Sequence, residues 1–520
     1  MQTLPWQQAF RAEEFAVSLP QADLLDLGAL CCAKKYRKEA QRPSAKEMVN
    51  AAACMEKGLY EEGGKCARSA LAGFQGDTLA MVDAIRLIVY AHTAQGKLKD
   101  AHVAAYAQLE GFCAQSDKAG EARMLLLLAH INLDKRGSRN RERAKEWALR
   151  ARQLFAEREE TKLEAQALLA LVNVVLKDRR DCFAAAEETK QLVGAAVPLL
   201  RSVKDVAGEG VAMHGLACAR ALVGSSEGAA EAGREALELF RQAKQRRFEA
   251  FELHCIAVWL INKDSDGAIE AAEESLEIYV QEKQQAFSQE AAVLRTLMRA
   301  YADSKAFNRA VETAREALER YESGGRKAQA AALEMLALGL SQCGELLEAV
   351  KATQQQAAIL LEEGDKTGRA RALRSLCRLC AHHRDFEQGI EAASEAASIS
   401  AELNQSEQAL ALQLLADCHR WNDAYTDARQ VAAQARQLYR RLGDRNNEVC
   451  AVLQACHASA LGGDRATALE LAGEAQDIAK RAGCKSLQGW GLFGDSEFQA
   501  KDGTSVRVCS LPTPFAILVT

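Results

Sequence analysis

The chain has 520 residues, of which 48% are hydrophobic and 26% are charged, and this balance excludes disorder of the chain as a whole. Its net charge of −5 gives no general attraction to nucleic acid or to anionic membranes. No stretch of about 18 apolar residues occurs, so the sequence predicts no membrane-spanning helix.

The positions of proline predict an all-α body. Of the six prolines, only Pro198 lies between Ser44 and Leu511. Proline breaks the interior of a helix, so its near absence from this long stretch is typical of a helical protein. The sixteen cysteines are scattered and mostly lie in apolar helical runs, without disulfide-like spacing. This usage favours a reducing compartment, and we expect a cytoplasmic protein.

Residues 1–43 precede the regular part of the chain. The first residues lack an apolar signal core and carry Glu13 and Glu14, so we predict no secretory or transit peptide. Leucines between Leu24 and Leu30 fit one amphipathic helix, and the basic run Lys34–Lys38 follows. An array of helical repeats needs a covering element at its end, so we predict an N-terminal helical cap over residues 1–43.

Residues 44–485 contain an internal repeat of two predicted helices. A small residue recurs early in the second helix of each unit, at intervals of 38 to 44 residues. A period this regular predicts about eleven helix-turn-helix repeats in one solenoid. The recurring small residues are Gly63, Ala101, Ala144, Ala185, Ala229, Ala268, Ala310, Ala349, Gly389, Ala428 and Ala468.

Each unit reads as two amphipathic helices joined by a short break. In the unit 291–321, apolar residues recur at helical spacing on both sides of a break at residues 303–305. Such a hairpin cannot bury its apolar face alone, so neighbouring hairpins must stack. Gly364-Asp365, Asn404 and Gly443-Asp444 separate successive units, where glycine ends one helix and Asp or Asn caps the next.

At these positions the chain resembles the tetratricopeptide repeat family. A second small residue follows seven positions after the first, and an aromatic often precedes the first by three. The period near 40 and the missing helix-closing proline resemble the longer-repeat scaffolds of the G-protein-signalling-modulator and kinesin-light-chain type. The resemblance implies a right-handed α-α superhelix that binds other proteins in its concave groove. The second small residues are Ala236, Ala317, Ala396, Ala435 and Ala475, and the aromatics are Tyr60, Phe307, Phe386 and Tyr425.

Residues 486–520 fall outside the period. Glycines from Gly489 onward, together with Pro512 and Pro514, interrupt any helical pattern, and the chain ends in the short apolar run 515–519. We predict an irregular C-terminal tail.

Three motifs resemble catalytic or metal-binding sites, and the repeat frame explains two of them as structural. Gly224-Ser-Ser-Glu-Gly228 matches the pattern of a hydrolase nucleophile elbow, but a helix precedes it where a strand is required. Cys377 and Cys380 occupy interior positions of a first helix and lack a second ligand pair at zinc spacing. Phosphate-binding glycine motifs are absent from the sequence. We therefore expect no enzyme, no cofactor and no metal site.

The segment 262–273 is the third motif, and it supports an alternative. Asn262, Asp264, Asp266, Gly267 and Glu273 occupy the positions that an EF-hand loop uses to bind calcium. The repeat frame instead makes this segment a turn followed by a second helix, and no second hand is present to pair with it. A calcium-modulated regulatory module remains an alternative function on this motif.

Arginines on first helices are the candidate partner-binding residues. Arg371, Arg374 and Arg378 share one helix face, and Arg295 and Arg299 hold equivalent positions two repeats earlier. In tetratricopeptide arrays these positions line the concave groove. Arg420 and Trp421 fall near the same surface in the next repeat. Arginine suits the capture of carboxylates and tryptophan suits anchoring, whereas a solvated charged face is the simpler interpretation.

From these features we predict a protein-interaction scaffold or adaptor. Its concave groove would take an extended or helical segment of another protein, with acidic character if the arginines bind it. A nucleic-acid-binding solenoid is a further alternative, but it would need a basic groove throughout a chain whose net charge is −5. We expect neither a membrane nor a nucleic acid as partner.

Overall fold

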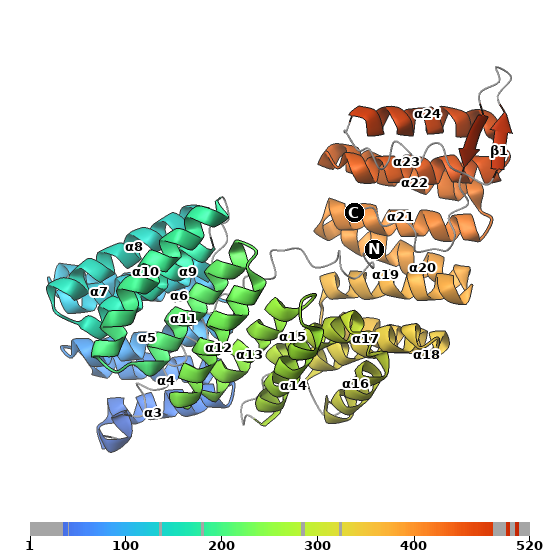
Figure 1. The fold of residues 1–520 in the computed structure, drawn as a ribbon. Coiled ribbons are helices and arrows are strands. Elements are labelled where there is room, and N and C mark those ends of the chain that lie inside the picture. The colour runs from blue at the N-terminus through green and yellow to red at the C-terminus, as the bar shows by residue number, and fades with distance from the viewer. Residues whose placement is uncertain are drawn as a thin grey trace. The chain divides into compact units, whose positions relative to one another are not determined.

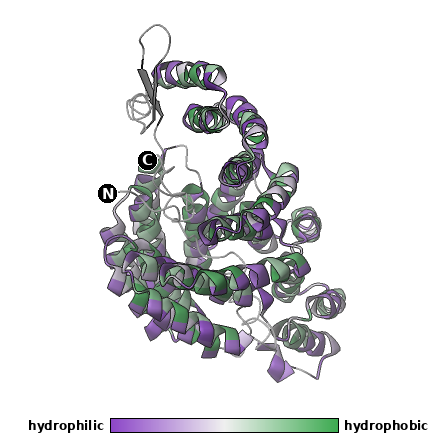
Figure 2. Ribbon diagram, turned by 90° about the vertical axis from the view of Figure 1, so that its right-hand side faces the viewer, coloured by the Kyte–Doolittle hydropathy of each residue, from purple (hydrophilic) through white to green (hydrophobic). Residues whose placement is uncertain are grey.

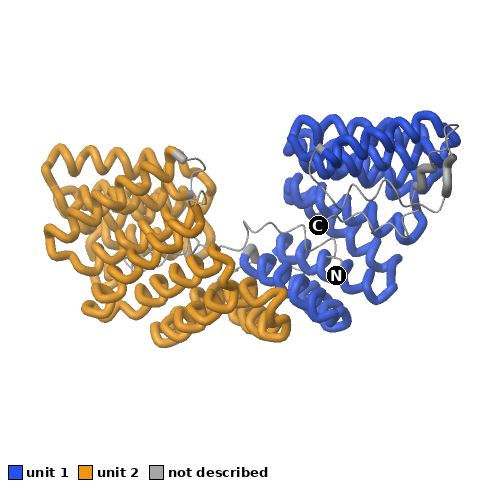
Figure 3. Tube along the Cα trace, turned by 45° about the horizontal axis from the view of Figure 1, so that its top comes forward, with its two compact units in different colours: residues 1–10, 287–520 blue, residues 11–286 orange. Residues whose placement is uncertain are grey.

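The computed structural model describes residues 35–39, 41–134, 138–177, 181–281, 287–321, 325–481, 496–499 and 505–508. Within these ranges the chain forms 22 α-helices, a short 3-10 helix and two strands (Figure 1). It divides into two compact units, which are residues 11–286 and residues 287–520 together with 1–10 (Figure 3). We call them the N-terminal unit and the C-terminal unit and describe each by itself.

The N-terminal unit contains six helix pairs. The 3-10 helix η2 (Arg37–Glu39) precedes the first pair. The pairs are α3 (Pro43–Glu56) and α4 (Tyr60–Gly73), α5 (Thr78–Ala94) and α6 (Leu98–Ala114), α7 (Lys118–Asp134) and α8 (Ser138–Glu157), α9 (Thr161–Leu176) and α10 (Cys182–Ser202), α11 (Val206–Leu222) and α12 (Ser226–Gln242), and α13 (Arg246–Leu260) and α14 (Ser265–Gln281).

The C-terminal unit contains five helix pairs and a β-hairpin. The pairs are α15 (Phe287–Asp303) and α16 (Phe307–Tyr321), α17 (Arg326–Gln342) and α18 (Leu346–Glu362), α19 (Lys366–His383) and α20 (Phe386–Leu403), α21 (Gln405–Trp421) and α22 (Tyr425–Leu442), and α23 (Arg445–Leu461) and α24 (Arg465–Arg481). The strands β1 (Ser496–Gln499) and β2 (Ser505–Val508) pair antiparallel, with Ser496 opposite Val508.

The helices of each unit form two layers. Within each unit, every helix packs on the next one along the chain, and first helices of successive repeats also contact each other, as α5 does with α7 and α19 does with α21. The first helices thus line one side of a unit and the second helices the other. Most helices carry both hydrophilic and hydrophobic residues, as a helix with one buried side requires (Figure 2). No helix among the described residues is both long and apolar enough to cross a membrane.

The recurring small residues lie where the helices meet. All eleven are in second helices, from Gly63 in α4 to Ala468 in α24, and all eleven are buried. The small residues seven positions later, such as Ala317 and Ala435, are buried as well. A larger side chain at these positions would push the helices apart, because protein interiors are close-packed. The eleven predicted repeats are therefore confirmed within the described residues.

The turns between successive repeats contain the predicted helix-ending and helix-capping residues. Gly364 and Gly443 adopt positive φ angles of 69° and 73°, a conformation in which glycine has no steric penalty. The side chain of Asp365 accepts a hydrogen bond from the Gly368 amide at 2.9 Å, and that of Asp444 accepts one from the Asn447 amide at 3.1 Å. Asn404 caps α21 in the same way. One residue therefore ends each helix and the next begins the following one.

The two ends of the chain differ from the repeats. The leucine-rich pattern of residues 24–30 and most of the N-terminal cap lie outside the described residues. Tyr36 is described and buried, and its hydroxyl donates to Asp83 at 3.0 Å, so the segment 35–39 packs on the first repeats. Within residues 486–520, for which we predicted an irregular tail, the described residues form the hairpin of β1 and β2. Alternation in Ser505-Val506-Arg507-Val508 is a strand pattern that a search for helical period does not detect.

Candidate partner-binding surface

The Gly224–Gly228 motif is a turn between two helices. Helix α11 ends at Leu222 and α12 begins at Ser226, and Gly224 has a φ of 83°. Ser225 is the residue before α12 and follows no strand. A nucleophile elbow needs a strand before the serine, so this motif has the predicted structural role.

The calcium-like segment 262–273 does not form a twelve-residue loop. Helix α14 begins at Ser265, and the Asp264 side chain accepts a hydrogen bond from the Gly267 amide at 3.0 Å. Glu273 lies in the third turn of α14, away from the turn that holds Asn262. An EF-hand wraps its oxygen ligands around one ion from a continuous loop, so this geometry disfavours the calcium alternative.

Cys377 and Cys380 are both buried in α19, as predicted for interior positions. The Cys377 sulfur lies 3.2 Å from the sulfur of Cys418 in α21, and the Cys380 thiol donates to Gln388 Oε1 at 3.0 Å. These sulfur atoms help to pack α19 against its neighbours. They behave as small apolar residues.

The predicted partner-binding arginines lie on the first helices α15, α19 and α21, and we call this set the arginine face. Its two residues on α15 have low exposure. Arg299 is buried, with 7% of its surface exposed, and Arg295 is half-buried. Little of Arg299 is therefore open to a ligand.

Helix α19 carries the central part of the arginine face. Arg371 is exposed and its Nε lies 3.6 Å from Glu334 Oε1 of α17, whereas Arg374 is mostly buried and pairs with Glu407 of α21. Arg378 is exposed and has no ion-pair partner among the described residues. Burial among surrounding atoms lowers the pKa of Arg378, and the charge of Arg374 lowers it further.

Helix α21 carries Arg420 and Trp421. Arg420 donates to Asp417 Oδ1 at 3.1 Å, and its guanidinium lies 5.4 Å from the centre of the Trp421 ring. Trp421 also packs against Phe386, with ring centres 6.4 Å apart. Burial raises the pKa of Asp417, although Arg420 and Gln454 hydrogen-bond to it and oppose that rise. The cation–π contact and the ion pair are internal to α21, and the packing of Trp421 on Phe386 connects its end to α20.

Acidic residues of adjacent repeats neutralise most of this surface. Four arginines, Arg371, Arg374, Arg378 and Arg420, face three carboxylates, Glu334, Glu407 and Asp417. The local balance of the seven groups is therefore one positive charge, and Arg378 contributes it. Sequence analysis missed the carboxylates because it searched for basic residues only. The available signal was an acidic residue about one period away from Arg371 and Arg374, and another three positions before Arg420.

Comparisons with known proteins give distant similarity only. No protein-family model and no curated protein matches the chain. Three solved structures illustrate the similarity. BtubC (BKLC) from P. vanneervenii is 16% identical, the match covers 43% of this chain and 94% of that chain, and the TM-score is 0.38. The signal-transduction ATPase with numerous domains and a tetratricopeptide repeat sensor from Pyrococcus horikoshii is 13% identical, with 82% of this chain and 68% of that chain covered and a TM-score of 0.41. The apo form of the quorum sensor NprR from B. thuringiensis is 13% identical, with 70% of this chain and 99% of that chain covered and a TM-score of 0.41.

The fold follows from the helices of the chain itself. Within the described residues the chain forms eleven helix pairs, with small residues buried where the helices meet and contacts between first helices of successive repeats. This is the architecture of a tetratricopeptide-type repeat protein.

Proposed function

We propose that the chain is a protein-interaction scaffold that binds an acidic segment of another protein on the arginine face of its C-terminal unit. The observation that carries this proposal is Arg378, an exposed arginine of the first helix α19 that has no acidic partner among the described residues. An exposed arginine without an acidic partner can bind a carboxylate of a ligand, because its guanidinium presents several donors in a fixed plane.

Neighbouring residues extend this site along α19 and α21. Arg371 is exposed beside Glu334 at 3.6 Å, a distance too long for a strong hydrogen bond. Trp421 is half-buried next to Arg420 and offers an aromatic surface to an apolar side chain of the ligand. A segment with acidic residues and one aromatic or aliphatic anchor would fit this combination.

The carboxylates that pair with these arginines, such as Glu407, limit the expected affinity for a ligand. A ligand carboxylate gains most at Arg378, whereas at Arg374 it must compete with Glu407. We therefore expect moderate affinity that depends on salt, because the site is open to solvent and screened by ions. The calcium and nucleic-acid alternatives have less support, because Glu273 lies within helix α14 and the net charge is −5.

A charge reversal at Arg378 tests the proposal. The probe is a fluorescein-labelled peptide rich in Asp and Glu with one aromatic residue, and fluorescence anisotropy measures its binding to the full chain. A charge-assisted hydrogen bond contributes about 1.5–3 kcal/mol, so Arg378→Glu should weaken binding by about 10- to 150-fold. Exposed positions change stability by less than about 0.5 kcal/mol, so the variant should stay folded.

Arg441→Glu is the matched control, because Arg441 is an exposed arginine of α22 in the second-helix layer. It makes the same change of charge without touching the arginine face, and we expect wild-type affinity. Equal losses in both variants would mean that the peptide responds to overall charge only, and unchanged binding by Arg378→Glu would place the interaction elsewhere. We also propose a cytoplasmic location, because the described residues include twelve free cysteines.

A further inference from the structure

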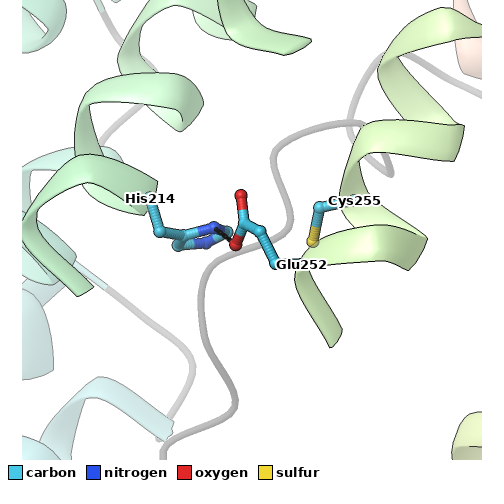
Figure 4. A group of neighbouring side chains, drawn as sticks. All are labelled: His214, Glu252 and Cys255. Atoms are coloured by element: carbon cyan, nitrogen blue, oxygen red, sulfur yellow. Dashed lines mark hydrogen bonds and ion pairs between the residues drawn. The ribbon is translucent and has the colours of Figure 1, made fainter. Parts of the chain in front are cut away.

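Four metal-ligand side chains meet in the core of the N-terminal unit. His214 and Cys218 lie one turn apart on α11, and Glu252 and Cys255 lie at a spacing of three on α13. These are first helices of consecutive repeats. His214, Glu252 and Cys255 point toward one another from the two helices (Figure 4). All four side chains are buried.

The ligand atoms are close to the separations that a single ion requires. His214 Nδ1 lies 2.6 Å from Glu252 Oε2, and His214 Nε2 lies 3.2 Å from the sulfur of Cys218. One ligand atom each from His214, Glu252 and Cys255 lie within 4.8 Å of one another. Tetrahedral zinc has bonds of about 2.0–2.3 Å, which places its ligand atoms about 3.3–3.8 Å apart. Small side-chain rotations would bring these atoms into that range.

The second oxygen of Glu252 gives independent evidence for a cation. Glu252 is completely buried, yet its Oε1 has no hydrogen-bond partner among the described residues. Buried polar atoms are nearly always satisfied, and an unsatisfied carboxylate oxygen often marks an ion that is bound there. A hydrogen bond between His214 and Glu252 accounts for Oε2 only. It leaves Oε1 and the sulfur of Cys255 without a role.

The surroundings hold the cluster in place. The rings of Phe251 and Trp259 pack around His214, with centres 5.4 and 6.1 Å from its own. On α12, a methyl group added to Gly233 would lie 3.0 Å from Glu252 Oε1 and 2.8 Å from Trp259. Gly233 thus lets α12 approach the carboxylate closely. The ligands sit on rigid helices in a dry, closely packed environment, as structural metal sites do.

We propose that His214, Glu252 and Cys255 form a buried structural site for one divalent zinc ion, with Cys218 beside the second nitrogen of His214 as a supporting residue. A sulfur, an imidazole nitrogen and a carboxylate oxygen are donors that zinc prefers, with a fourth position open to water, whereas magnesium and calcium prefer oxygen atoms alone. When zinc binds, the Cys255 thiol releases its proton to solvent and the thiolate coordinates the ion. The ion would join the fifth and sixth repeats of the N-terminal unit through α11 and α13.

Metal loading of the full chain tests the site. The protein is dialysed against a chelator and titrated with Co²⁺, whose thiolate charge-transfer absorption and intense visible bands report tetrahedral coordination with sulfur. We expect one Co²⁺ per chain, displaced by one Zn²⁺. Cys255→Ala and Glu252→Gln should each weaken the metal by at least about tenfold, since even outer ligands of zinc sites have effects of that size. Cys456→Ala removes a buried cysteine of the C-terminal unit and should leave the metal affinity unchanged.

X-ray absorption of the zinc-loaded wild-type chain gives a readout that does not depend on variants that fold poorly. We expect a first coordination shell of one sulfur atom and two or three nitrogen or oxygen atoms. A shell of oxygen atoms only, or a metal content that is the same in the wild type and in Cys218→Ala/Cys255→Ala, would overturn the proposal. His214 and Glu252 would then be a buried ion pair without a metal.

Discussion

Acidification should destabilise the C-terminal unit through His457 of α23. Burial and the nearby charge of Arg420 lower the pKa of His457 from 6.5 to about 4. The unfolded chain therefore takes up a proton at a higher pH than the folded one. Stability contributed by the neutral imidazole is present above pH 6.5 and is lost as the pH falls from 6.5 toward 4.

The size of this effect follows from the shift. A change in pKa from 6.5 to about 4 corresponds to about 3 kcal/mol at its limit. His457 is only half-buried, so we expect about 1–3 kcal/mol after discounting for solvent. His457→Gln cannot take up the proton and should lose less stability than the wild type over this pH range.

Hydrogen exchange followed by mass spectrometry measures this in the full chain. Peptides from α23 report the local free energy of opening once the intrinsic pH dependence of exchange is removed. The wild type should lose protection in α23 between pH 6.5 and 4.5, and His457→Gln should keep more of it. His383→Gln, which alters an exposed residue at the end of α19, is the control. If His457→Gln and the wild type lose the same protection, His457 does not carry the proton linkage.

Three further predictions concern the repeats. A fragment of residues 35–281 should fold by itself with the helix content of the N-terminal unit by circular dichroism, because repeats contact only their neighbours, and an unfolded fragment would count against this. Arg384→Gly should raise the free energy of unfolding by about 0.5–1 kcal/mol in urea titrations, because Arg384 has a φ of 62°, and a loss of stability would refute the strain. Tyr439→Phe should lower it by about 1 kcal/mol, because the buried hydroxyl donates to Gln413 at 2.6 Å; a neutral substitution would show that this bond contributes nothing.

The positions of the repeats could be predicted because they depend on residues that are close together in the sequence. A small residue is needed wherever two helices touch, and glycine or a capping residue is needed wherever a helix ends. Ala310 and Gly364 illustrate the two kinds of position, and each lies where the pattern placed it. Both requirements act over a few residues, so they leave a periodic trace in the sequence.

The division into two units left no such trace. The interval between Ala268 and Ala310 is 42 residues, within the range of the other repeats, and no proline or glycine-rich segment marks residue 286. A boundary in a repeat array depends on how well two neighbouring faces fit. That property belongs to side-chain packing across the interface and not to the pattern of either repeat alone.

Whether the arginines are paired with carboxylates also could not be predicted from the local sequence. Arg374 pairs with Glu407, 33 residues later, and Arg371 lies beside Glu334 of the preceding repeat. Helical spacing correctly placed the arginines together on α19, but whether they are neutralised depends on the next first helix in space. Comparison of each first helix with the one a period away would have revealed these pairs.

The proposed zinc site around His214 and Glu252 also joins residues about one period apart in the sequence. This pairing suggests a role for buried polar groups in the fold. His214 meets Glu252 38 residues later, as Asp417 meets Gln454 37 residues later at 2.9 Å. Each pair joins first helices of consecutive repeats. Alanine-rich surfaces are nearly featureless and would allow neighbouring helices to slide by one turn with little change in apolar burial. A buried hydrogen bond or a shared ion is satisfied in one register only, since an unpaired buried charge is strongly unfavourable. These polar contacts therefore fix the register of a solenoid whose small residues alone would leave it poorly specified.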